Sequence, residues 1–146
     1  MEWVDEKRLK AMKEKVPDPS KPGRTLPFVP DGFFALQVGE RRACFFLEVD
    51  RGTMPTGRFQ TKVRAYLSFR QSGRGVERFG TRNFRVLTVT SGKKRLASLL
   101  KATEKAGGDH HFWFTTFSQI TPEAVLTAPI WQVVGLEGLH ILLEGG

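Results

Sequence analysis

Two apolar runs separated by a tight turn constrain the fold of this 146-residue chain more than any other feature. Phe33 to Val38 and Arg42 to Asp50 are short and rich in β-forming residues, and Gly39-Glu40-Arg41 stands between them. Apolar runs joined by a glycine-containing turn are typical of a β-hairpin. The chain must therefore build part of its core on an antiparallel pair of strands.

The segment after the hairpin alternates between helical and extended patterns. Apolar residues recur at helical spacing from Phe59 to about Gln71, and a second helix is expected after Ser91, a capping residue, ending at Gly107. The remaining elements are strands at Phe84 to Thr90, Phe112 to Phe117 and Ile130 to Val134, and a short helical turn at Thr121 to Leu126. Antiparallel strands early and crossovers late predict an α/β (α+β) fold with a mixed central sheet flanked by helices.

The segments around these elements are less regular. Trp3, Leu9, Met12 and Val16 lie near helical spacing, which predicts a first helix over residues 2–15. Residues 17–30 contain five of the eight prolines and are predicted to form a loop that ends in an extended piece at 26–29. Residues 72–82 are predicted to form a loop rich in glycine and arginine. We expect residues 1–146 to form one domain, since the length suits a single core.

Composition excludes several classes of protein. The chain contains no apolar run of the roughly 18 residues that a membrane span requires, and its first residues are charged rather than apolar as in a signal peptide. The single cysteine, Cys44, lies in an apolar run and is expected to be a reduced core residue. We therefore expect a cytoplasmic protein without a membrane partner.

The positive charge is concentrated in the middle of the sequence. Residues 51–105 contain fourteen basic residues against two acidic ones, Glu77 and Glu104, which gives this block a net charge of +12. Phosphate backbones are the commonest partners of such blocks, because neutralised phosphates release counterions. DNA is the partner we expect, and an acidic protein surface is the competing interpretation. The expected nucleic-acid-binding residues are Arg51, Arg58, Arg64, Arg70, Arg74, Arg78, Arg82, Lys93, Lys94 and Arg95.

Three carboxylates are expected to meet at one end of the hairpin. Glu48 and Asp50 are two residues apart on one strand and so share a face, and the hairpin returns Asp31 towards them. Such clusters bind hard cations, so these three residues are the candidate metal ligands for Mg²⁺ or Mn²⁺. Lys62 in the following helix would support charge there. Without a metal, salt bridges to Arg51, Arg58 or Lys62 must neutralise the cluster.

These residues carry a family resemblance. Pro30-Asp31 ahead of one strand and Glu48-Val49-Asp50 on the next resemble the PD-(D/E)xK nuclease superfamily. More narrowly, the sequence from Pro30 through Lys62 to Tyr66 is similar to the replication-relaxation proteins of plasmids and other mobile elements. The resemblance implies a restriction-endonuclease-like αβββαβ core and a nuclease-like domain with Asp31, Glu48, Asp50 and Lys62 as its catalytic residues.

Two departures from the family pattern bear on function. Asp50 stands where the motif has lysine, so catalysis would require Lys62 to substitute from the helix. The winged-helix region usual at the N-terminus of the family is expected to be absent, so DNA contacts would come from residues 51–105. A metal-dependent endonuclease or nickase, a catalytically inactive DNA-binding accessory of the same fold, and a module that docks an acidic protein all stay open. A homodimer mediated by the acidic tail stays open as well.

Two further groups have structural interpretations. His110 and His111 are adjacent, and on a strand they would point to opposite faces, which argues against a shared metal site. Phe112-Trp113-Phe114 is expected in the core. Lys93, Lys94 and Arg95 lie in the first turn of a predicted helix, where the helix dipole disfavours cations, and this favours a binding role.

Overall fold

The structure is a computed structural model that describes residues 2–12 and 14–143. Its strands are β1 (Glu2–Val4), β2 (Glu14–Pro17), β3 (Thr25–Phe28), β4 (Gly32–Val38), β5 (Arg41–Val49), β6 (Arg85–Thr90), β7 (Phe112–Thr116) and β8 (Gln132–Val133). Its helices are α1 (Glu6–Met12), α2 (Thr56–Ser72), α3 (Gly75–Phe79), α4 (Lys93–Lys105) and α5 (Ala124–Thr127), with a 3₁₀ turn at Phe117–Gln119. No helix in these ranges is long and apolar enough to cross a membrane.

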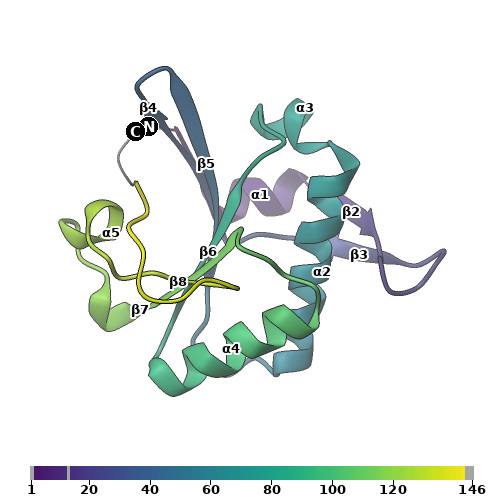
Figure 1. The fold of residues 1–146 in the computed structure, drawn as a ribbon. Coiled ribbons are helices and arrows are strands. Elements are labelled where there is room, and N and C mark those ends of the chain that lie inside the picture. Colours follow the sequence, from purple (N-terminus) through teal and green to yellow (C-terminus); the bar gives the residue numbers. More distant parts are fainter. Residues whose placement is uncertain (1, 13, 144–146) are drawn as a thin grey trace.

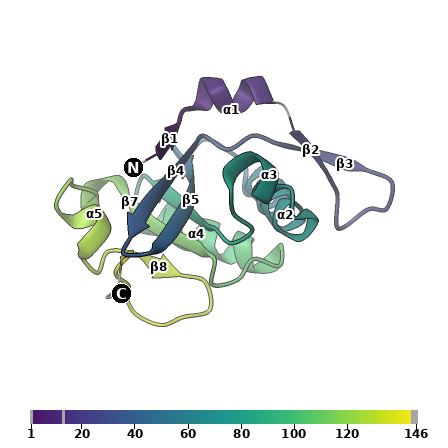
Figure 2. The ribbon, with the colours of Figure 1, turned by 90° about the horizontal axis from the view of Figure 1, so that it is seen from above.

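A mixed six-stranded sheet organises the molecule. Its strand order is β1-β4-β5-β6-β7-β8, with β5, β6 and β7 parallel and the other pairs antiparallel. Helices α2 and α4 pack against each other on one face, and α5 with the C-terminal segment covers the other (Figure 1). The two-stranded sheet of β2 and β3 lies beside α2 (Figure 2). The predicted α/β (α+β) class with a mixed sheet is confirmed.

The core is aromatic on the face that α2 and α4 cover. Phe46 on β5 is fully buried and contacts Phe28, Phe79 and Phe84 edge to face, with ring centroids 4.8–5.5 Å apart. Aromatic pairs of this geometry add to the free energy of burying their area. Cys44 is also buried and free, and Phe112–Phe114 lie in the core as predicted. This packing fixes β5 and α2, which carry the candidate site.

The predicted first helix is wrong in extent. Residues 2–4 form β1, which pairs with β4 and sets Trp3 opposite Phe34, and only Glu6–Met12 is helical. Val16 is fully buried on β2, which pairs with β3. Pairing with strands from elsewhere in the chain overrides a weak helical pattern. The side chain of Met12, which contributed to that pattern, lies outside the described residues.

Later elements follow the prediction with local corrections. The hairpin, α2, β6, α4 and β7 lie where expected, and β3 confirms the extended piece after the proline-rich loop. The loop predicted at residues 72–82 instead contains the short helix α3. Gly92 rather than Ser91 is the N-cap of α4, and it makes no side-chain cap hydrogen bond. β8 is only two residues long, shorter than the strand predicted at residues 130–134, and residues 144–146 lie outside the described part of the chain.

Gly73 ends α2 and gives a first testable prediction. Its φ of 75° lies in the left-handed region, and an added Cβ would meet the guanidinium of Arg82 at 2.8 Å. Because L residues are strained there, Gly73→Ala should lower the free energy of unfolding by about 1 kcal/mol in urea denaturation. Gly57→Ala is the matched control. Gly57 lies in the same helix with open space around its Cβ, so alanine there should not destabilise the protein.

Candidate functional site

The three predicted carboxylates lie at the end of the sheet where β5 and β6 finish. Glu48 and Asp50 are buried on the helix-covered face, whereas Val49 between them is exposed, so the predicted shared face is confirmed. Asp31 returns to β5 through the hairpin, and its Oδ2 accepts a hydrogen bond of 2.8 Å from the backbone N–H of Val49. The hairpin therefore brings all three acids to the same end of the sheet.

Glu48 is buried between two side chains of α2. Its Oε1 lies 2.7 Å from Nζ of Lys62, and its Oε2 accepts a hydrogen bond from the hydroxyl of Tyr66. Burial raises the pKa of Glu48 to about 7, and Lys62 only partly offsets that effect. Lys62 also donates to the carbonyl of Val29. Lys62 is thus directed at Glu48 as the sequence predicted.

Asp50 is held by a different helix. Arg95 at the start of α4 donates to both carboxylate oxygens at 2.9 Å, and the hydroxyl of Thr90 donates to Oδ2 at 2.6 Å. Burial opposes ionisation, but the hydrogen bonds from Arg95 and Thr90 outweigh it and lower the pKa of Asp50. Arg95 also donates to the carbonyl of Met54 and so ties the loop after β5 to α4. The Asp50–Arg95 pair is a buried structural link.

These partners bear on whether the acids fit a divalent metal. A hard cation needs several free carboxylate oxygens. Both oxygens of Glu48 and both oxygens of Asp50 instead accept from donors of the protein itself, two of them cationic. The set Asp31, Glu48 and Asp50 therefore does not fit Mg²⁺ or Mn²⁺ in this arrangement, and we derive no catalytic step through a metal.

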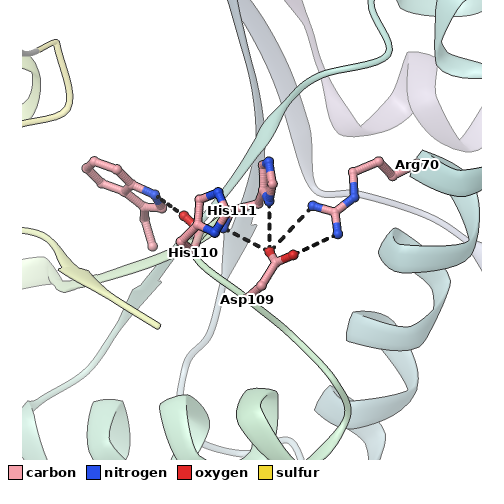
Figure 3. A network of polar contacts seen from close by, with 5 residues as sticks. Arg70, Asp109, His110 and His111 are labelled. Carbon is pink, nitrogen blue, oxygen red and sulfur yellow. Dashed lines mark hydrogen bonds and ion pairs between the residues drawn. The ribbon is translucent and has the colours of Figure 1, made fainter. Parts of the chain in front are cut away.

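A separate His and Asp cluster lies at the start of β7. Potential ligand atoms of Asp109, His110 and His111 come within 4.8 Å of one another (Figure 3). The imidazoles are 4.3 Å apart between centroids, so the prediction that they point to opposite faces is wrong, because the two residues lie in a turn before the strand. Arg70 forms an ion pair with Asp109 at 3.0 Å and hydrogen bonds to both its oxygens. This guanidinium neutralises the carboxylate without a metal ion.

Several of the predicted DNA-binding arginines are paired within the protein. Arg74 and Arg78 both form ion pairs with Glu14 on β2, Arg70 pairs with Asp109, and Arg95 pairs with Asp50. These acids lie outside the basic block of the sequence. Arg64 is half-buried and donates to Thr61, and Arg82 is exposed beside Gly73. The +12 block is therefore partly neutralised in three dimensions.

Four other predicted cations remain exposed at one end of the sheet. Arg51 follows β5, Arg58 lies in the first turn of α2, and Lys93 and Lys94 lie in the first turn of α4. Because β5 and β6 are parallel, the helices that follow them begin at the same end of the sheet, which is the lower end in Figure 1. None of these four cations forms an ion pair with an acid in residues 2–12 or 14–143. We call Arg51, Arg58, Lys93 and Lys94 the basic end.

The helix termini add to the positive potential of the basic end. Neither α2 nor α4 has an acidic residue in its first turn, and neither has a side-chain cap. Apart from the N–H of Arg58, which donates to the carbonyl of Pro55, the first backbone N–H groups are left for another acceptor, and the helix dipoles favour an anion. A shallow depression lined by Ser91, Lys93, Lys94 and Ser98 opens there. The arrangement presents cations and backbone donors, which together favour an anion.

Sequence reasoning missed two partners of the acids. Thr90 had no predicted role, and Arg95 was predicted to contact DNA rather than Asp50. Tyr66 is buried, and the hydrogen bond from its hydroxyl to Glu48 was not predicted. A polar residue at an inward strand position, such as Thr90, is the signal that a buried acid needed a donor.

The fold and the basic end together define a mixed α/β protein with an anion-attracting edge. The family comparison places the chain more narrowly: residues 1–84, more than half of the sequence, match the family model described as replication-relaxation. The chain belongs to the replication-relaxation family, as the resemblance predicted. No curated protein and no solved structure matches it. The family name indicates a role in plasmid or mobile-element replication or relaxation.

Proposed function

We propose that this protein binds the DNA backbone through the basic end and acts as a non-catalytic DNA-binding component of plasmid or mobile-element replication or relaxation. Membership of the replication-relaxation family supports the process. The observation that carries the binding mode is the meeting of four exposed cations with two uncapped helix N-termini at one edge of the sheet. Phosphate contacts of this kind position a protein on DNA without reading its sequence.

Binding is favoured over cleavage by the state of the acids. Glu48 is paired with Lys62 and Asp50 with Arg95, so neither presents a free carboxylate to a metal or a water. The nuclease expected from the PD-(D/E)xK resemblance would need Mg²⁺ or Mn²⁺ to displace these cations from both residues. Docking of an acidic protein uses the same charges, but it predicts no affinity for DNA even at low salt.

Replacing all four residues of the basic end by glutamine should remove most of the DNA affinity. Each lost phosphate contact reduces the steepness of the fall of log K with log salt by about 0.9. The quadruple variant should therefore bind duplex DNA at least about a hundredfold more weakly at low salt, with a slope smaller by about 3 to 4. Fluorescence anisotropy with a labelled duplex across a salt series measures both quantities.

The matched control removes the same charge elsewhere. Lys7, Lys21, Lys101 and Lys105 are exposed away from the basic end, and their replacement by glutamine should change the slope by less than about 1. An equal loss of DNA affinity in both variants would mean that only net charge matters and would refute the basic end as the binding surface. Incubation of the native protein with supercoiled DNA and Mn²⁺, Mg²⁺ or EDTA completes the test. Metal-dependent nicking that Glu48→Gln abolishes would overturn the non-catalytic assignment.

A further inference from the structure

A cavity of about 540 Å³ lies at the opposite end of the sheet from the basic end. The starts of β5, β6 and β7 form its floor, and the C-terminal segment closes its side. Its polar lining consists mainly of Arg41, Arg42 and Arg85 and of all three histidines of the chain, His110, His111 and His140. None of the described residues that line it is acidic. A cavity of this composition attracts anions.

Two of its arginines have no acidic partner among the residues that the structure describes. Arg42 forms an ion pair with Glu2 at 3.0 Å. In contrast, neither Arg41 nor Arg85 pairs with an acid in the described part of the chain. Burial and the nearby charge of Arg41 lower the pKa of Arg85, so the two guanidinium groups repel each other across the cavity. A bound anion would relieve that repulsion.

The wall beside these charges is aromatic and apolar. The guanidinium of Arg85 lies 4.5 Å from the centroid of the Trp113 ring, and it is anchored by a hydrogen bond of 2.9 Å to the carbonyl of Leu142. The indole N–H of Trp113 donates to the carbonyl of His110 at 2.8 Å, which fixes the indole ring. The rings of Trp113 and His140 form a T-shaped pair with their centroids 6.0 Å apart. A planar heteroaromatic group suits such a wall.

We propose that this cavity binds one nucleotide unit, with its phosphate at Arg41 and Arg85 and its base against His140, whose ring packs on the buried Trp113. The volume lies within the range of cavities that hold small ligands, about 300–1,000 Å³. The unit is either a free mononucleotide or the phosphorylated end of a DNA strand, since both present the same chemistry. The inference does not rest on DNA binding at the basic end, because it uses none of those residues.

Isothermal titration calorimetry tests the proposal on the full chain. The probes are deoxyadenosine 5′-monophosphate, deoxyadenosine, inorganic phosphate and a single-stranded hexanucleotide with and without a 5′-phosphate. We expect the monophosphate to bind at least about tenfold more tightly than either deoxyadenosine or phosphate, because only the nucleotide uses both parts of the cavity. A preference for the 5′-phosphorylated hexanucleotide over the monophosphate identifies a strand end as the source, and the reverse order identifies a free nucleotide.

Two arginine variants locate the site. Arg85→Gln and Arg41→Gln should each weaken binding of the monophosphate by about tenfold or more, as expected for a lost charged hydrogen bond. Arg41 is exposed and its change leaves the packing intact, so it stays informative if Arg85→Gln disturbs the C-terminal segment. Arg24→Gln, an exposed arginine near the β2–β3 turn, should have no effect.

Three results would overturn the inference: no binding of any nucleotide at millimolar concentration, equal affinity for phosphate and the monophosphate, or unchanged affinity in both cavity variants. The quadruple variant of the basic end should keep its nucleotide affinity. If the native protein binds duplex DNA but no nucleotide, only the cavity proposal is refuted. If the quadruple variant loses duplex binding but keeps its nucleotide affinity, the two sites are separate.

Discussion

Asp50→Ala should lower the free energy of unfolding by about 3 kcal/mol at neutral pH. The side chain of Asp50 is 3% exposed and that of its partner Arg95 is 18% exposed. Removing the carboxylate leaves a largely buried guanidinium without a counter-charge, and it also leaves the hydroxyl of the fully buried Thr90 without its acceptor. Urea denaturation followed by tryptophan fluorescence measures the loss.

A second substitution separates loss of the pair from loss of packing. In Asp50→Ala, Arg95→Met the unpaired charge is gone, so the double variant should recover about half of the lost stability. Asp109→Ala is the comparison for an exposed pair. Asp109 is 39% exposed in its ion pair with Arg70, and its removal should cost about 1 kcal/mol or less. A loss below about 1 kcal/mol for Asp50→Ala, or no recovery in the double variant, would contradict the assigned role of the pair.

The geometry of the acids could be predicted because it depends on local rules. Side chains two apart on a strand share a face, which placed Glu48 with Asp50, and a hairpin returns its first strand to its second, which placed Asp31. Lys62 follows from the position of α2 directly after β5. These relations need no knowledge of distant contacts, so sequence alone was sufficient for them.

The partners of the acids and of the basic block could not be predicted in the same way. Arg95 lies forty-five residues from Asp50, and Arg74 and Arg78 lie about sixty residues from Glu14. Counting charge along the sequence gave +12 for residues 51–105, but four of these arginines meet acids from outside the block. The lining of the cavity beside Arg41 and Arg85 also comes from several distant segments. Which charges remain exposed is decided by tertiary packing.

The same limit explains the first helix. Its helical pattern rested on four apolar residues, and two of them, Trp3 and Val16, lie instead in strands. The pairing partners of those strands, β4 and β3, are both later in the chain. A short segment has little intrinsic helical stability, so backbone pairing with available strand edges determines its structure.

Glu48→Gln should gain stability relative to the native chain as the pH rises from about 4.5 to above 7. Burial raises the pKa of Glu48 from 4.5 to about 7 in the folded protein. Between these values the folded state holds a proton that the unfolded state has lost, so native stability falls as the pH rises through this window. At about 1.4 kcal/mol per pKa unit, the full penalty is about 3 kcal/mol.

Glutamine keeps the shape of the side chain and carries no charge to bury. The difference in unfolding free energy between Glu48→Gln and the native protein should therefore increase by about 3 kcal/mol between about pH 4.5 and about pH 8. Urea denaturation at half-unit pH intervals measures the curve. The pH dependence has the opposite sign for Asp50, whose pKa is lowered in the folded protein. Its contribution to stability is complete above pH 3.8, the ordinary pKa of an aspartate, and is lost as the pH falls below that value.

Glu104→Gln on the exposed surface of α4 is the control, and it should change stability by no more than about 0.5 kcal/mol across the range. A flat difference for Glu48→Gln would mean that Lys62 and Tyr66 keep the carboxylate fully ionised despite its burial. The same curve bears on function: a carboxyl that is protonated near neutral pH and held by a tyrosine is a poor metal ligand. A growing advantage of Glu48→Gln would thus support, from stability alone, the assignment of this acid to the structure of the protein rather than to phosphodiester cleavage.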